Sequence, residues 1–203
     1  MTTGAADPQA EADRIDESYQ ILRSRIDLSR LAPLSRAVTE HVIVASADFD
    51  YATDLVCDEE ALAAAVAEIA AGAVVIADAA PVAAGITGHA VICKSGESLT
   101  ERLARTAGIN SAAAAVRLAF GQVGPGGIWV VGGEPAALEE VICRDVQPSF
   151  VIGLPVGFAG AAEAKDALRA SGLASLSNLS EKGGAAVAAA AFNALLGAAE
   201  AQD

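Results

Sequence analysis

The chain is poor in basic residues: 13 Lys and Arg stand against 26 Asp and Glu among 203 residues, a formal net charge of −13. Proteins that bind nucleic acid nonspecifically, or that dock on anionic membranes, neutralise phosphates with Lys and Arg. The charge balance therefore argues against both, and we expect no nucleic acid and no membrane partner. The net negative charge also disfavours the long-range attraction of an anionic small molecule, although a local cationic pocket can still bind such a molecule.

Aromatic residues, paired cysteines and long apolar runs are also scarce. Aromatics make up 4% of the chain, so the core must consist mainly of Ala, Val, Leu and Ile. Cys57, Cys93 and Cys143 lie far apart without C-x-x-C spacing, which is typical of reduced thiols, and we expect no metal site. Apolar runs such as 185–196 are shorter than the ~20 residues of a membrane span. Residues 1–17 are acidic, unlike a signal peptide, so we expect a cytoplasmic protein.

The order of local patterns predicts the fold class. Residues 1–16 are polar and acidic, which predicts a disordered or frayed tail before a single domain over residues 17–203. The expected strands are 41–45, 73–77, 90–93, 128–131 and 149–153, and the expected helices are 17–31, 58–72, 99–106, 111–120, 135–144, 161–170 and 184–199. Strands that alternate with helices are typical of βαβ units. We therefore expect a three-layer α/β/α fold with a mostly parallel central sheet.

Ligands of such folds bind in loops that follow the carboxyl ends of the strands. The loops in question are expected at 45–51, 78–88, 132–135 and 154–160. Their carboxylates include Asp48, Asp50, Asp78 and Glu134. Such groups can bind a metal or act as a base, but loop aspartates more often cap helices and stabilise turns.

Two common kinds of catalytic or binding site are unsupported. The glycines at 121–127 lack the phosphate-loop pattern and precede a strand, so they indicate a turn. Ser-His-Asp catalysis is unsupported because no G-x-S-x-G elbow is present and His41 and His89 are the only histidines.

Two lysines stand close to the beginning of an expected helix. Lys165 follows the loop at 154–158, and Lys182 precedes Gly183 and Gly184. A lysine beside open amides at a helix N-terminus can hold an anion. For Lys165 the alternative is an exposed helical ion-pair surface.

The segment Val151–Phe158 (VIGLPVGF), followed by Glu163 and Lys165, resembles the signature of precorrin-8X methylmutases, also called precorrin isomerases. The resemblance extends in order and spacing from about residue 18 to residue 196. Supporting matches are Asp48–Ala52 (DFDYA), Asp78 with Gly85–Ile86, Pro135 with Ala137–Leu138, Lys182–Gly184 (KGG) and Asn193–Leu195 (NAL).

This resemblance implies a homodimer with tetrapyrrole sites near the subunit interface, and no added cofactor. Family members move a methyl group from C-11 to C-12 of precorrin-8X, which gives hydrogenobyrinic acid on the route to cobalamin. Protonation of a ring nitrogen by a histidine and a productive macrocycle geometry promote this 1,5-sigmatropic shift. The substrate-binding positions implied by the resemblance are Asp78, Asn110, Ser111, Gly133, Glu134, Pro155, Gly157, Lys165, Lys182, Gly183 and Gly184.

The sequence departs from the family pattern at the catalytic position. The family has Arg-x-Ile-His where this chain has His41-Val-Ile-Val44, so Val44 occupies the histidine position and cannot carry a proton. Possible substitutes are Asp48, His89 or solvent. On the expected extended segment, His41 would be roughly 10 Å from Val44 and face the opposite side.

Two further positions change the charge of the implied site. Asn110 and Glu181 stand where the family has arginine. Each lost charged hydrogen bond should weaken the binding of a polyanion by about 1–3 kcal/mol. Two hypotheses follow: a working methylmutase with another proton donor, or a catalytically silent homodimer that binds a tetrapyrrole, a partner protein or another small ligand.

Overall fold

Six short strands form one mixed sheet in the computed structural model, which describes residues 8–201. In chain order they are β1 (Leu55–Cys57), β2 (Val75–Ala77), β3 (Val91–Cys93), β4 (Ile128–Val131), β5 (Phe150–Gly153) and β6 (Ser175–Asn178). Their order in the sheet is β1-β6-β5-β4-β2-β3, and β1 alone is antiparallel to its neighbour. The predicted mostly parallel sheet is confirmed.

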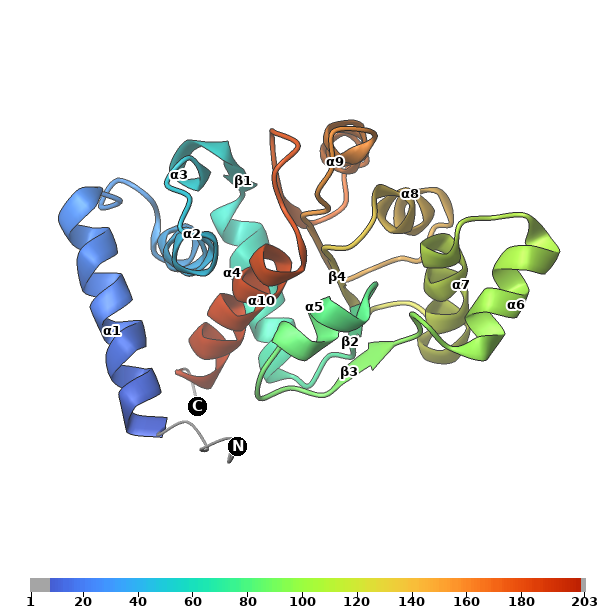
Figure 1. Ribbon diagram of the computed structural model, residues 1–203, viewed down its shortest axis with the longest axis horizontal. Coiled ribbons are helices and arrows are strands. Elements are labelled where there is room, and N and C mark those ends of the chain that lie inside the picture. Colours follow the sequence, from blue (N-terminus) through green and yellow to red (C-terminus); the bar gives the residue numbers. More distant parts are fainter. Residues whose placement is uncertain (1–7, 202–203) are drawn as a thin grey trace, which may run out of the picture.

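Helices cover both faces of this sheet (Figure 1). One side holds α1 (Pro8–Arg25), α2 (Pro33–Ser46), α3 (Tyr51–Asp54), α4 (Glu59–Ala70), α5 (Ala80–Gly85) and α10 (Ala185–Glu200). The other side holds α6 (Ser98–Ala107), α7 (Ser111–Val123), α8 (Pro135–Cys143) and α9 (Ala161–Ala170). The result is the expected three-layer α/β/α fold.

Alternation along the strands divides the core into two apolar layers. Val130 packs toward α10, whereas its neighbour Trp129 packs toward α7, α8 and α9. Small side chains let elements approach closely, since a Cβ on Gly132 would lie 2.6 Å from the Cβ of Ala188 on α10. Close backbone approach thus supplies packing that large aromatic side chains provide in other cores.

The strand expected at 41–45 is wrong, because these residues belong to α2. Pro33 stands in the first turn of this helix, and Val38, Val42 and Ile43 are buried, with α10 packed against the helix. Burial on a neighbouring helix therefore outweighs the local strand preference of a β-branched run. His41 and Val44 consequently lie about one helical turn apart, where Cβ atoms are about 5–6 Å from each other. The expected separation of roughly 10 Å on opposite faces is wrong.

Other differences concern the ends and the polar strands. The first helix begins at Pro8, so residues 8–16 of the expected tail are helical, and residues 1–7 lie outside the described part of the chain. The loop expected at 45–51 follows a helix and not a strand. The strands β1 and β6 were not expected. Within residues 8–201, no helix combines the length and apolar character required to cross a membrane.

Candidate functional site

An apolar groove lies between α1 and α2, with a volume of about 210 Å³. It is lined by Ser18, Ile21, Leu22, Arg25, Ile43, Val44, Ala47 and Phe49. Arg25 is the cation of this lining, and it forms no hydrogen bond or ion pair within the described residues. The groove therefore offers an apolar wall with one uncommitted positive charge, which fits an apolar ligand that carries a carboxylate.

The end of α2 brings polar groups next to Val44. Ala47 adopts a left-handed conformation with φ 55°, and its N–H donates to the Ile43 carbonyl at 2.7 Å, which ends the helix. Asp48 then starts the connection to α3. A carboxylate thus stands four positions after Val44, beside the lining residues Ala47 and Phe49.

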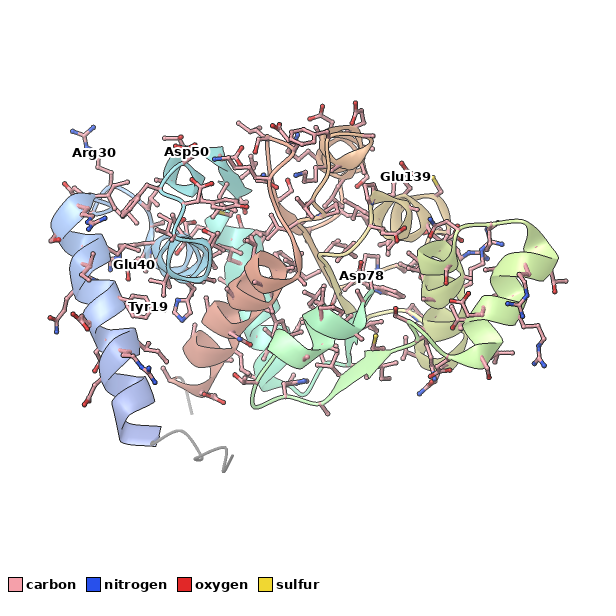
Figure 2. All side chains as sticks on the ribbon, viewed as in Figure 1. Tyr19, Arg30, Glu40, Asp50, Asp78 and Glu139 are labelled. Atoms are coloured by element: carbon pink, nitrogen blue, oxygen red, sulfur yellow. The ribbon has the colours of Figure 1, made fainter. Side chains whose placement is uncertain are left out.

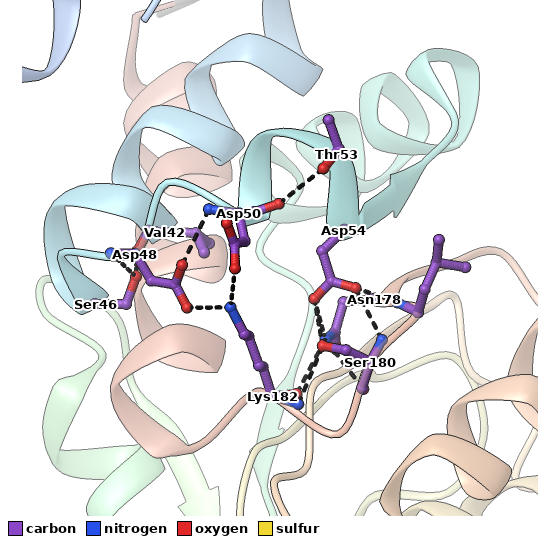
Figure 3. Close-up of polar contacts among 10 residues, drawn as sticks. Val42, Ser46, Asp48, Asp50, Thr53, Asp54, Asn178, Ser180 and Lys182 are labelled. Atoms are coloured by element: carbon purple, nitrogen blue, oxygen red, sulfur yellow. Dashed lines mark hydrogen bonds and ion pairs between the residues drawn. The ribbon is translucent and has the colours of Figure 1, made fainter. Parts of the chain in front are cut away.

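Lys182 joins this connection to the segment before α10 (Figure 3). Its ammonium donates to Asp48 Oδ2 at 2.7 Å and to Asp50 Oδ2 at 2.6 Å. The hydrogen bond from Lys182 lowers the pKa of Asp48, and the same two carboxylates raise the pKa of Lys182. Asp48 is accordingly ionised at neutral pH and accepts hydrogen bonds, and Lys182 is already paired within its own chain.

Lys165 is fully buried, with 0% of its surface exposed. The ammonium donates to Asn178 Oδ1 at 2.8 Å, to the Lys182 carbonyl at 2.7 Å and to the Ser180 carbonyl. Burial lowers its pKa to about 8. The alternative of an exposed helical ion-pair surface is therefore wrong, and this lysine binds main-chain and amide oxygens of residues 178–182.

Asp54, at the end of α3, contacts the same turn, at Asn178 and Ser180 (Figure 3). Its carboxylate accepts from the main-chain N–H of Ser180 at 2.8 Å, from Ser180 Oγ at 2.7 Å and from Asn178 Nδ2 at 2.7 Å. Burial acts to raise the pKa of Asp54, but the hydrogen bonds from Asn178 and Ser180 outweigh it and hold the pKa below its usual value. Sequence reasoning missed Asp54 and Asn178, because 124 positions separate them and no local pattern links them.

The loops after β5 and β6 pack directly on each other. Gly184 donates its N–H to the Leu154 carbonyl at 2.8 Å, and Gly157 donates to the Glu181 carbonyl at 3.1 Å. Gly183 has φ +151°, and a Cβ there would lie 2.3 Å from the Leu154 oxygen. Only glycine fits this contact. The N–H of Gly184, expected to be open for an anion, is already used, and Pro155 is buried beside it.

A second polar cluster forms at the carboxyl ends of β2 and β4. The buried carboxylate of Asp78 accepts from the N–H of Gly132 at 3.0 Å and of Gly133 at 2.9 Å. Burial raises the pKa of Asp78, and these amide hydrogen bonds act in the opposite direction. Gly132 also lies against Gly184, since a Cβ on it would be 3.0 Å from the Gly184 carbonyl. The cluster around Asp78 therefore lies next to the segment of Lys182, Gly183 and Gly184.

Asn110 and Ser111 lie at the start of α7, and Asn110 reaches Glu134, the residue that follows Gly133. Asn110 caps this helix, because its side-chain oxygen accepts from the Ala112 N–H at 2.6 Å. Its amide donates to Glu134 Oε2 at 2.9 Å, and Ser111 Oγ donates to Glu101 at 2.6 Å.

The two histidines lie outside the groove lining. His41 contacts the Ala37 carbonyl through Nδ1 at 2.9 Å, and its ring packs edge-on against Tyr19 at 5.4 Å. His89 contacts the Ala90 carbonyl and packs against Phe192. Among residues 8–201, no three or more His, Cys, Asp or Glu side chains gather in a way that could hold a metal ion.

Comparison with known proteins gives concordant results. A family model described as precorrin-8X methylmutase matches residues 15–198. The chain is 34% identical over 183 residues to the cobalt-precorrin-8 methylmutase of Salmonella typhimurium, with 87% of each chain covered. It is 36% identical over 186 residues to that of Methanothermobacter thermautotrophicus, with 89% of each covered.

Precorrin-8X methylmutases are similar as well. The enzyme of Sinorhizobium sp is 32% identical over 192 residues, covering 89% of this chain and 91% of the relative. The crystal structure of the precorrin-8X methylmutase from Thermus thermophilus superposes with a TM-score of 0.84 at 29% identity, covering 94% of this chain and 97% of that one.

Proposed function

The chain belongs to the precorrin-8X methylmutase family, and we propose that it binds a precorrin-8 tetrapyrrole and moves a methyl group from C-11 to C-12. The observation that carries this proposal is the family match over residues 15–198, together with relatives of 34% and 36% identity. The reaction is an isomerisation on the route to cobalamin.

We assign the reacting edge of the macrocycle to the groove between α1 and α2, whose lining suits such a ligand. Its walls are apolar, as a ring edge bearing methyl groups requires, and Arg25 supplies a cation for one peripheral carboxylate. We assign Lys182, Gly183 and Gly184 to the adjoining wall, because Lys182 pairs with Asp48, which follows the groove residue Ala47.

The proton donor of this mechanism must be a group other than the side chain of residue 44. Val44 has no proton to donate, and Lys182 keeps Asp48 ionised at neutral pH, so Asp48 suits the role of acceptor better than that of donor. His41 lies about one turn before Val44 on the same helix, which makes it a closer candidate than an extended segment would allow.

The second candidate function is a catalytically silent paralogue that binds the tetrapyrrole without converting it. One observation favours it: Val44 lines the groove at the position where the family resemblance implies a histidine, and it cannot transfer a proton. Such a protein would keep the affinity for the macrocycle and lack turnover.

We also propose the homodimer of the family, in the cytoplasm. The support is a group of exposed apolar side chains on the loops after β5 and β6: Val156 at 49%, Phe158 at 96% and Leu179 at 55% exposure. Sedimentation equilibrium tests this proposal, with a dimer expected for the natural chain and a weaker dimer for Phe158→Ser. A monomer at micromolar concentration would contradict it.

The function is tested by mixing the purified protein with precorrin-8X, or with cobalt-precorrin-8, and following the absorbance spectrum. Conversion of either compound supports the methylmutase and excludes the silent paralogue. Binding of hydrogenobyrinic acid without any conversion supports the silent paralogue. Absence of both binding and conversion contradicts both tetrapyrrole functions.

A further inference from the structure

The turn between β6 and α10 is held by a cation that ligands cannot reach. Lys165 is fully buried, and its three N–H groups have three acceptors: Asn178 Oδ1, the Ser180 carbonyl and the Lys182 carbonyl. An ammonium group has three donors, so all of them are used. This lysine therefore has neither an exposed surface nor a spare donor for a bound molecule.

A buried charge of this kind requires a counter-charge, which here is the carboxylate of Asp54. Asn178 connects Lys165 to it. Its amide oxygen accepts from Lys165 at 2.8 Å, and its amide nitrogen donates to Asp54 Oδ2 at 2.7 Å. Asp54 also accepts from the N–H of Ser180 at 2.8 Å and of Leu179 at 3.1 Å. Lys165 and Asp54 thus hold opposite sides of one turn, carbonyl groups on one side and N–H groups on the other.

Lys182 connects this turn to the carboxylates next to the groove. Its carbonyl is bound by Lys165, whereas its ammonium reaches Asp48 and Asp50 next to the groove (Figure 3). The position of the Lys182 ammonium thus depends on main-chain atoms that Lys165 orders.

We propose that Lys165 is a positioning residue that, with Asp54, fixes the turn at 178–182 and thereby aims Lys182 at the tetrapyrrole site, without touching the ligand itself. This inference rests on the proposed function, because that function assigns Lys182 to the ligand. It replaces the direct substrate contact that the family resemblance implied for Lys165.

The test compares Lys165→Met with Arg169→Met. Arg169 lies one turn further along α9 and also donates to β6, to Ser177 Oγ at 2.9 Å and the Asn178 carbonyl at 2.7 Å. Both variants remove one cation from the same helix, but only Lys165→Met removes hydrogen bonds to residues beyond β6. Asp54→Asn acts on the turn from the other side and serves if Lys165→Met does not fold.

Two measurements are made on each variant: amide hydrogen exchange of residues 179–184, and a titration with hydrogenobyrinic acid followed by absorbance. For Lys165→Met and Asp54→Asn we expect exchange in this segment to accelerate at least about tenfold, with β4 and β5 unchanged, and affinity for the ligand to fall about tenfold. Arg169→Met should leave both quantities close to those of the natural chain.

The outcomes separate this proposal from the function on which it rests. Unchanged exchange at 179–184 in the variants overturns the positioning role, and a lost affinity with unchanged exchange shows a direct ligand contact. If the natural chain does not bind the tetrapyrrole, the proposed function fails. Faster exchange would in that case show that Lys165 orders the turn, but it would overturn the role in ligand binding.

Discussion

The ammonium of Lys182 lies 2.6 Å from the carboxylate of Asp50, although 132 positions separate these residues in the sequence. Asp48 takes a second hydrogen bond from the same ammonium at 2.7 Å. The cation next to the groove is therefore surrounded by carboxylates of its own chain. A ligand that carries carboxylates must compete with Asp48 and Asp50 for this ammonium. Part of the acidic excess of the chain therefore lies where it opposes the binding of an anion.

Replacement of Asp50 by asparagine should strengthen the binding of an anionic tetrapyrrole. The Asp50 side chain is 77% exposed, so solvent screens its ion pair with Lys182, and removing this weak competitor should raise affinity up to about fivefold. Titration with hydrogenobyrinic acid at low salt measures the effect. The control is Glu139→Gln on α8, away from this cluster (Figure 2), which changes the net charge equally. An equal gain in both variants would assign the effect to net charge alone.

Replacement of Val44 by histidine should increase turnover of precorrin-8X. The substitution places a group that titrates near neutral pH in the lining of the groove, and a positioned proton donor accelerates such steps on the order of a hundredfold. Initial rates followed by absorbance give the result. Val44→Asn is polar without a transferable proton and should show no such gain. Equal rates in the two variants would mean that polarity, and not proton transfer, is limiting.

Gly183→Ala should destabilise the protein more than Gly157→Ala. Both glycines have φ near +150°, but a Cβ at Gly183 would meet the Leu154 oxygen at 2.3 Å, whereas at Gly157 the nearest atom is 3.8 Å away. We expect a loss of about 2–4 kcal/mol at Gly183, against about 1 kcal/mol of backbone strain at Gly157. Urea unfolding measures both. Equal losses would show that the turn moves away from Leu154 freely.

The free energy of unfolding should depend on Lys165 in alkaline solution. Its pKa is about 8 in the folded protein, below the ordinary value of 10.5. Between these pH values the unfolded chain retains a proton that the folded protein has released, so the contribution of Lys165 to stability rises with pH. Below pH 8 both states are protonated, and the cost of burying the charge is fully present.

Urea unfolding from pH 7 to pH 10, for the natural chain and for Lys165→Met, isolates this contribution. The natural chain should gain stability relative to the variant as the pH rises. A difference that is independent of pH would show that Lys165 titrates at the same pH folded and unfolded.

Local sequence pattern was sufficient to predict the helices and strands in which the spacing of apolar residues matches their burial. Helix α9 was predicted over 161–170 and is observed at those bounds, because its apolar positions recur at helical spacing. The buried strands β2, β4 and β5 were predicted from continuous apolar runs. The polar strand β6 has no such signal, since its residues are Ser-Leu-Ser-Asn, and it forms because β5 pairs with it on one side and β1 on the other.

The amino-acid sequence by itself determined the fold class and the family, because these depend on local periodicity and on motifs, and it singled out Asp48, Lys165 and Lys182, but not Asp54 or Asn178. The tertiary structure decided what those residues touch. It placed residues 41–45 in a helix packed on α10, buried Lys165 beneath the turn and paired Lys182 with Asp48 and Asp50. Contacts across more than a hundred positions arise only when the chain is packed, and they determine which charges face a ligand and which face each other.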